Sequence, residues 1–225
     1  MINERRNHTT ALPRHIVWDW NGTLQDDVQA AVNGINLLLG QRGMEQVSIG
    51  RHRELFTFPV ADYYRALGFV LDNEDWDEMA RTFITAFAAD SSTRLFEGTV
   101  PALSRLEAAG VPMSILSACQ RDVLEEALSS AGIRRFFRTV KGLGDPGAGS
   151  KTALAEELFA TIDAPAGDVL MVGDTTHDKE VADAAGCRCI LLASGYQSRE
   201  RLAACGCTVL DSVADVPAFL GIGAG

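Results

Sequence analysis

Residues 16–24 read IVWDWNGTL, and this stretch decides how the rest of the chain is interpreted. An apolar run ends at Asp19, and Gly22 follows in a turn, which is the pattern of a buried strand presenting a carboxylate at its end. A carboxylate placed there is suited to act as a nucleophile. Two residues later the chain has Asn21, whose amide neither gives nor takes a proton at neutral pH.

Short apolar runs alternate with helical patterns along most of the chain. We expect strands at residues 15–19, 112–117, 136–140, 169–173, 188–193 and 208–210. Helices between them end at Gly110, Gly132 and Gly186, as is typical of helix C-termini. This alternation predicts an α/β protein with a Rossmann-like parallel sheet core and helices on both faces.

Residues 26–96 interrupt the alternation, because they show helical patterning without a buried strand. About seventy residues is far more than a strand-to-strand crossover needs. We therefore expect a helical cap at 26–96 inserted into a catalytic core formed by 14–25 and 97–225. Residues 1–13 are polar and lack an apolar signal-peptide centre, which predicts a disordered leader.

The composition narrows the possible partners. A formal net charge of -10 argues against nucleic acid and anionic membranes, but a local pocket still permits a small phosphorylated metabolite. No apolar run reaches the roughly 20 residues that span a bilayer. The odd count of five cysteines without an export signal predicts reduced thiols and a cytoplasmic protein. The spacing in Cys187-Arg-Cys189 and Cys205-Gly-Cys207 is short for structural zinc.

Polar side chains gather at the carboxyl ends of the predicted strands, where open α/β sheets bind ligands. Taken singly, each has an ordinary structural explanation, such as a helix cap or a solvated lysine. Together they suit phosphoryl transfer, because paired carboxylates repel unless a divalent cation lies between them and Mg²⁺ prefers hard oxygen ligands. The set comprises Asp19, Asn21, Thr23, Ser117, Lys151, Asp174 and Asp178.

A competing motif is GDPGAGSKT at residues 144–152, which is similar to a phosphate-binding P-loop. That loop requires glycine directly before its lysine, and here Ser150 precedes Lys151. A P-loop also leaves the pattern around Asp19 unexplained. A P-loop kinase therefore stays the less favoured alternative.

The motifs as a set resemble the haloacid dehalogenase-like hydrolases, mostly Mg²⁺-dependent phosphatases, in the branch similar to phosphoglycolate phosphatase. IVWDWNGTL resembles the first motif, SILSAC the second, Lys151 the third and VLMVGDTTHD the fourth. The resemblance implies that Asp19 is the nucleophile, that Ser117 and Lys151 bind phosphate, and that Asp174 ligates Mg²⁺ with support from Asp178. It also implies that the inserted helices form the helical cap of this branch.

Asn21 departs from the family pattern, in which an aspartate ligates Mg²⁺ through its backbone carbonyl and shuttles protons through its carboxyl. The carbonyl survives in asparagine, so Asn21 stays a candidate metal ligand, but the acid–base function is lost. General acid–base catalysis contributes about 10²–10⁴-fold, which is the expected loss of rate. We expect a slower or more selective phosphatase, and that Asn21→Asp raises the rate, most of all for alkyl phosphates. The alternative is a pseudophosphatase that binds a phosphorylated ligand or a protein.

The substrate contacts are less defined than the chemistry. Arg51, within the basic run Arg51-His52-Arg53 of the insertion, is a candidate substrate-binding residue together with Thr23, Ser117 and Lys151. The basic run, with Phe56 and Phe58 nearby, is a candidate to line a lid over the site. We expect a monomer or a homodimer.

Overall fold

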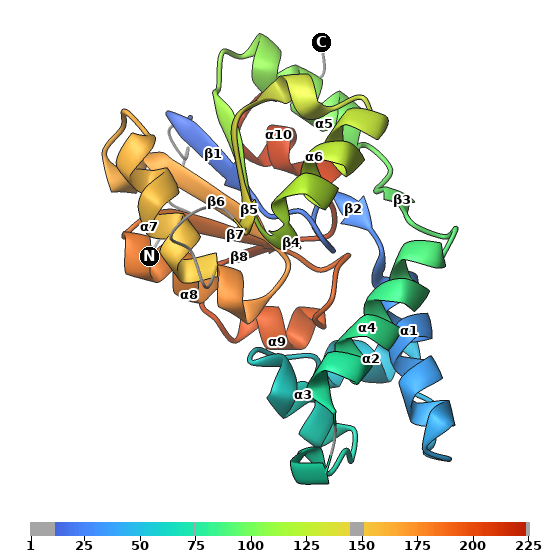
Figure 1. Ribbon diagram of the computed structural model, residues 1–225. Helices are drawn as coiled ribbons and strands as arrows, with labels where there is room; N and C mark the ends of the chain where they lie inside the picture. The colour runs from blue at the N-terminus through green and yellow to red at the C-terminus, as the bar shows by residue number, and fades with distance from the viewer. Residues whose placement is uncertain (1–11, 74, 145–150, 224–225) are drawn as a thin grey trace, which may run out of the picture.

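A six-stranded parallel sheet forms the centre of the protein (Figure 1), in the order β5-β4-β1-β6-β7-β8. The computed structural model describes residues 12–73, 75–144 and 151–223, so most of the predicted leader and the loop at 145–150 lie outside the described residues. The strands are β1 (His15–Trp18), β4 (Met113–Gln120), β5 (Phe137–Leu143), β6 (Val169–Gly173), β7 (Arg188–Leu192) and β8 (Thr208–Leu210).

Helices cover both faces of this sheet, and the predicted α/β fold class is confirmed. On one face lie α5 (Thr99–Ala108), α6 (Arg121–Ser130) and α10 (Val216–Phe219), with the short turns η2 (Arg134–Phe136) and η4 (Val213–Asp215). On the other face lie α7 (Lys151–Thr161) and α8 (Thr176–Ala185). The remaining elements of the core are η3 (Ala166–Asp168) and α9 (Arg199–Ala203).

Strands β4 and β5 each continue three residues beyond their predicted ends. Their pairing shifts register between Leu116 and Gln120, so β4 carries an irregularity where the site residues emerge. The added residues of β4 are Ala118, Cys119 and Gln120, which lack β-branched and large apolar side chains, and this is why the sequence did not indicate a strand there.

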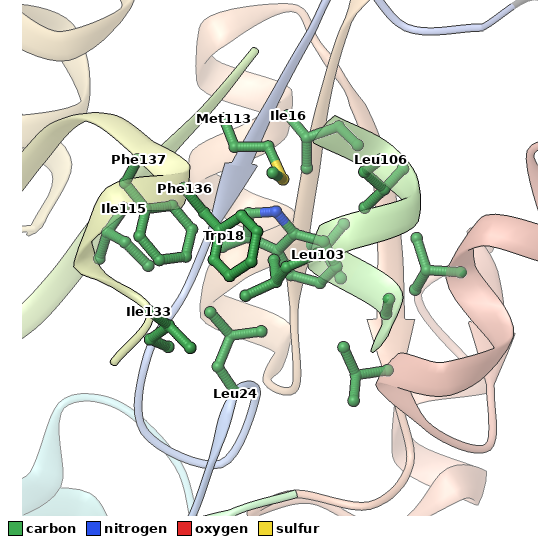
Figure 2. Close-up of a cluster of buried hydrophobic side chains, with 14 of the residues drawn as sticks. Ile16, Trp18, Leu24, Leu103, Leu106, Met113, Ile115, Ile133, Phe136 and Phe137 are labelled. Atoms are coloured by element: carbon green, nitrogen blue, oxygen red, sulfur yellow. The ribbon is translucent and has the colours of Figure 1, made fainter. Parts of the chain in front are cut away.

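The larger apolar core lies between the sheet and α5, α6 and α10. Figure 2 shows side chains from β1, β4 and α5 meeting around Trp18, which is fully buried. Alternate residues of β1 serve the two faces, since Ile16 and Trp18 belong to this core while Val17 packs beneath α7 and α8. Burial on both faces fixes the position of β1, and therefore that of Asp19 directly after it.

Residues 28–89 form a helical lobe to one side of the sheet (Figure 1). Its elements are α1 (Val28–Gln41), α2 (Ile49–Leu55), α3 (Val60–Ala66), η1 (Leu71–Asn73) and α4 (Trp76–Ala89). The lobe has an apolar cluster of its own. It joins the core through an antiparallel ribbon of β2 (Gln25–Asp26) and β3 (Arg94–Leu95). Strands of two residues show no periodicity in the sequence. The sequence analysis expected only helices in the insertion and therefore did not predict β2 and β3.

The lobe also contacts the core through the segment after β7. The Arg53 guanidinium donates to the carbonyls of Ser194 (2.7 Å) and Gly195 (2.8 Å). Gln197 Nε2 donates to the Phe56 carbonyl (2.9 Å), and the Phe56 ring lies 4.9 Å from that of Tyr196. The end of α2 is therefore held beside the carboxyl end of β7.

Candidate active site

The turn after β1 brings Asp19 to the carboxyl edge of the sheet. The Trp20 carbonyl accepts hydrogen bonds from the backbone amides of Leu24 and Gln25 (both 3.0 Å), which closes the turn. Gly22 has φ 73°, and a Cβ built on it would lie 2.3 Å from Asp174 Oδ2. Glycine is therefore required here by both its backbone conformation and the close approach of the carboxylate.

Lys151, the first residue of α7, bridges two of the predicted carboxylates. Its ammonium donates to Asp19 Oδ1 and to Asp178 Oδ1, the latter at 2.7 Å. All three side chains are nearly inaccessible to solvent. Burial works against the charged amine, but the neighbouring carboxylates raise the pKa of Lys151, so the ammonium persists at neutral pH. The structure thus brings together residues separated by 132 positions in the chain.

Asp174, directly after β6, is held entirely by neutral donors. Its Oδ1 accepts from the Thr23 hydroxyl (2.8 Å) and its Oδ2 accepts from the Tyr196 backbone amide (2.7 Å). Burial, and then the charges of Asp19 and Asp178, raise the pKa of Asp174 well above its ordinary value. Within the described residues no lysine or arginine forms an ion pair with Asp174. A buried carboxylate without a cationic partner is costly, which favours a bound cation at this place.

Asp19, Asp174 and Asp178 together fit a divalent cation. Each offers a carboxylate oxygen, and these oxygens all lie within 4.8 Å of one another. Burial, opposed by Lys151, raises the pKa of Asp19 to about 6. A cation among these oxygens would offset the repulsion between the carboxylates, and an all-oxygen donor set with few protein groups suits Mg²⁺.

Asp178 also stabilises the start of α8. Its Oδ2 accepts from the Thr175 backbone amide (3.0 Å) and hydroxyl (2.7 Å), and the Thr175 side chain accepts in return from the Asp178 amide, which forms a capping box. Burial opposes its ionisation, but Lys151 and Thr175 hold the pKa of Asp178 below its ordinary value. The carboxylate is therefore charged, and it is oriented by the helix that carries it.

The other predicted residues differ in their surroundings. Ser117 is buried in β4, and its Oγ accepts from the Cys119 amide (3.0 Å), which leaves the hydroxyl proton free to be donated. Thr23 was expected to contact substrate, but its side chain is fully buried and bonded to Asp174, so it orients that carboxylate instead. Arg51 is not brought to the group, because its guanidinium is 58% exposed and pairs with Glu54 at 2.9 Å.

Two contacting residues, Asp27 and Tyr196, were missed by the sequence analysis, whereas Arg53 was named there among the basic residues of the predicted lid. Asp27 is fully buried against Asn21, whose Nδ2 donates to Asp27 Oδ2 at 2.5 Å. Burial raises the pKa of Asp27 to about 7. The only feature of the sequence that pointed to Asp27 was its place as the second of two consecutive aspartates at the start of the insertion. Charged residues are common at helix starts, so this feature did not distinguish Asp27 as a site residue.

Comparison with known families identifies the architecture. Residues 16–192 match the model of the haloacid dehalogenase-like hydrolases, which covers the four motifs and the helical lobe. The chain belongs to this family. Its predicted membership is confirmed, and the chain is thus a hydrolase by family.

Two relatives of the family carry different activities in their names. The chain is 30% identical over 196 residues to a phosphoglycolate phosphatase of Pseudomonas fluorescens, covering 82% of this chain and 71% of the relative. It is 26% identical over 211 residues to the tyrosine-protein kinase PtkA of Mycobacterium tuberculosis, covering 91% of this chain and 70% of the relative.

A solved structure has the same fold. A haloacid dehalogenase-like hydrolase from Streptococcus pneumoniae superposes with a TM-score of 0.77 at 18% identity, covering 93% of this chain and 99% of that one. Within the described residues, no helix is both long and apolar enough to cross a bilayer.

Proposed function

We propose that the protein is a Mg²⁺-dependent phosphatase that hydrolyses a small phosphorylated metabolite through a phosphoaspartate at Asp19. The observation that carries the proposal is the convergence of Asp19, Lys151, Asp174 and Asp178 at one sheet edge, with the Lys151 ammonium bridging two carboxylates. The names of several relatives as phosphoglycolate phosphatases support it.

In this mechanism an Asp19 carboxylate oxygen attacks phosphorus, and the bond between phosphorus and the leaving oxygen breaks. Lys151, at the start of α7, and the Ser117 hydroxyl, in β4, bind the phosphoryl oxygens, because both are buried donors at the sheet edge that carries Asp19. Asp19, Asp174 and the Asn21 backbone carbonyl would hold Mg²⁺, with Asp178 in support. The bound cation would supply positive charge to the phosphoryl oxygens. Water then hydrolyses the phosphoaspartate and regenerates Asp19.

The amide at Asn21 restricts which esters react well. With no acid at this position, the leaving oxygen departs without receiving a proton from residue 21. Aryl phosphates, whose leaving groups are stable as anions, therefore react better than alkyl phosphates relative to an ordinary member of the family. The helical lobe acts as a cap over the site. Arg53, which donates to the carbonyls of Ser194 and Gly195, takes the place of Arg51 as the basic residue of the lobe that contacts the core.

Asp19→Asn tests the nucleophile, because the change is nearly isosteric. We expect turnover of an aryl phosphate with Mg²⁺ to fall to background while the circular dichroism spectrum stays that of the parent. Asp26→Asn is the matched control, since Asp26 pairs with Arg94 (2.8 Å) on the ribbon away from Lys151. Residual turnover above a few per cent in Asp19→Asn would remove Asp19 from this role.

The relation to PtkA favours a second candidate, transfer of a phosphoryl group to a protein tyrosine. Incubation with ATP labelled at the γ-phosphate separates the two: labelled inorganic phosphate supports the hydrolase, and labelled protein tyrosine supports the kinase. Absence of both, with Mg²⁺ bound, would favour the pseudophosphatase that only binds its ligand. We further propose that the protein is a cytoplasmic monomer or homodimer. Its net negative charge supports the proposal that it binds neither nucleic acid nor anionic membranes.

A further inference from the structure

Asp27 is a buried carboxylate that the proposed reaction leaves without a task. It occupies the N-cap position of α1, where an aspartate ordinarily accepts hydrogen bonds from the first turn, yet its side chain makes no capping bond. Instead it turns back towards the nucleophile turn, where Oδ1 accepts from the Gly22 amide (3.0 Å) and Oδ2 from Asn21 Nδ2 (2.5 Å). The Tyr196 hydroxyl also lies near this carboxylate.

These contacts fix the orientation of the Asn21 amide. A primary amide has two N–H donors, and Asn21 gives them to Asp27 Oδ2 and to Gln25 Oε1 (3.2 Å). The ionised carboxylate accepts only, so whenever Asp27 is charged the donor Nδ2 faces it and Oδ1 faces away. Oδ1, which receives no hydrogen bond from the described residues, is then the atom of residue 21 available to a water molecule or a substrate hydroxyl.

We propose that Asp27 is a positioning residue and that residues 21 and 27 act as one amide–carboxylate pair in the reaction. The proposal rests on the proposed phosphatase function. The family pattern has a carboxylate at position 21, whereas this chain has an amide there and a buried carboxylate, Asp27, in contact with it. The pair presents an acceptor oxygen at position 21 and holds it in one direction, which suits it to orient the water that hydrolyses the phosphoaspartate.

The pair also links the nucleophile turn to the carboxylate of Asp174. The side chain of Tyr196 lies near Asp27, and its backbone amide donates to Asp174 Oδ2 (2.7 Å). Gly22 lies between them, because its amide donates to Asp27 and its Cα faces Asp174. Loss of the Asp27 carboxylate therefore frees the Asn21 amide to rotate and loosens the turn that carries Asp19.

This inference changes the expected result of Asn21→Asp. That single substitution places two carboxylates where 2.5 Å now separates an amide nitrogen from a carboxylate oxygen, and like charges in contact are unfavourable. The restored acid would thus arrive in a disrupted site. Exchange of the two residues, Asn21→Asp with Asp27→Asn, keeps one donor and one acceptor in contact and supplies a carboxyl at position 21.

The experiment is a double-mutant cycle of the full chain with Mg²⁺, using an aryl and an alkyl phosphate. We expect Asp27→Asn to lower kcat about tenfold with little change in KM, because amide facing amide no longer fixes which atom faces the site. We expect Asn21→Asp to lose rate on both esters and the exchange variant to recover at least the parent rate. Asp26→Asn, at the adjacent position, should match the parent.

The proposal would be overturned if the effects of the two substitutions on kcat were additive. If Asn21→Asp alone raises the rate as much as the exchange does, residues 21 and 27 do not act as a pair. A second readout does not depend on turnover. Each single variant should lower the melting temperature, and the exchange variant should lose less than the sum of the two losses. If the parent hydrolyses neither ester, the proposed function fails, while the melting temperatures still decide whether the pair exists; additive temperature losses would then refute it.

Discussion

Replacing Lys151 with methionine tests whether the buried bridge between Asp19 and Asp178 holds the site together. Methionine keeps the length of the side chain but removes the ammonium, and it leaves two buried carboxylates without their cation. Breaking a buried ion pair by removing one partner costs about 3–5 kcal/mol. For a chain of this size that loss lowers the melting temperature by roughly 6–20 °C, at about 2–4 °C per kcal/mol.

Lys179→Met is the matched control. Lys179 pairs with Asp183 at 2.5 Å one turn along α8, but the aspartate side chain is 63% exposed, and a surface pair of this kind contributes about 0.3–0.5 kcal/mol. Urea unfolding without metal, followed by the fluorescence of the buried Trp18 and Trp20, gives both free energies of unfolding. A loss in Lys151→Met no larger than in Lys179→Met would refute the reasoning.

The comparison has a pH dependence with a definite sign. In the parent, Lys151 holds the pKa of Asp178 below its ordinary value, so this carboxylate stays ionised from pH 8 to 5 and its contribution to stability is constant over that range. In the variant, both carboxylates lose that support and take up protons more readily in the folded than in the unfolded chain, so acid relieves it. The deficit of Lys151→Met should therefore shrink as the pH falls from 8 to 5, and a deficit that grows would contradict the assignment.

Three further predictions follow from the same contacts. Thr23→Val removes the hydroxyl that donates to Asp174. A hydrogen bond to a charged group contributes about 1.5–3 kcal/mol, so Mg²⁺ binding should weaken about 10–100-fold in a calorimetric titration, and unchanged affinity would contradict this. Gly195→Ala places a Cβ 2.2 Å from Asp174 Oδ2 and should abolish turnover. In the control Gly206→Ala the new Cβ meets no atom within 4 Å, so turnover should be retained although alanine is strained at the φ of 70° found there. His15 hydrogen-bonds Ser114 (2.9 Å), and burial, then Arg138, lower the pKa of His15 to about 4. As the pH falls from 6.5 to 4, the free energy of unfolding of the parent should therefore drop by about 2–3 kcal/mol more than that of His15→Gln. The same pH dependence of both free energies in urea unfolding would contradict this.

Much of the arrangement at the sheet edge could be predicted from the sequence, because parallel strands place their carboxyl ends together. Asp19 and Asp174 directly follow strands whose apolar patterns are unambiguous. Lys151 was expected there from its place at the start of a helix, and the structure brings it to Asp19. These positions depend on strand order and helix starts, which local patterns specify.

The contacts between the lobe and the core could not be predicted in the same way. Of the basic residues Arg51 and Arg53, periodicity does not tell which faces the core, because a short helix such as α2 can be rotated by one residue without changing its composition. Asp27 and Tyr196 meet only when the lobe and the segment after β7 are assembled. Tertiary packing decides such contacts, and no local pattern carries them.

The ribbon of β2 and β3 has a consequence for how this chain can diversify. The lobe leaves and re-enters the core through paired residues, Gln25 opposite Leu95 and Asp26 opposite Arg94, so its two ends are neighbours in space. A segment with adjacent ends can be replaced by another of different length without altering the register of the six-stranded sheet. The chain is in this sense modular: an exchanged lobe would change what reaches Asp19 while the sheet that positions Asp19 stays the same.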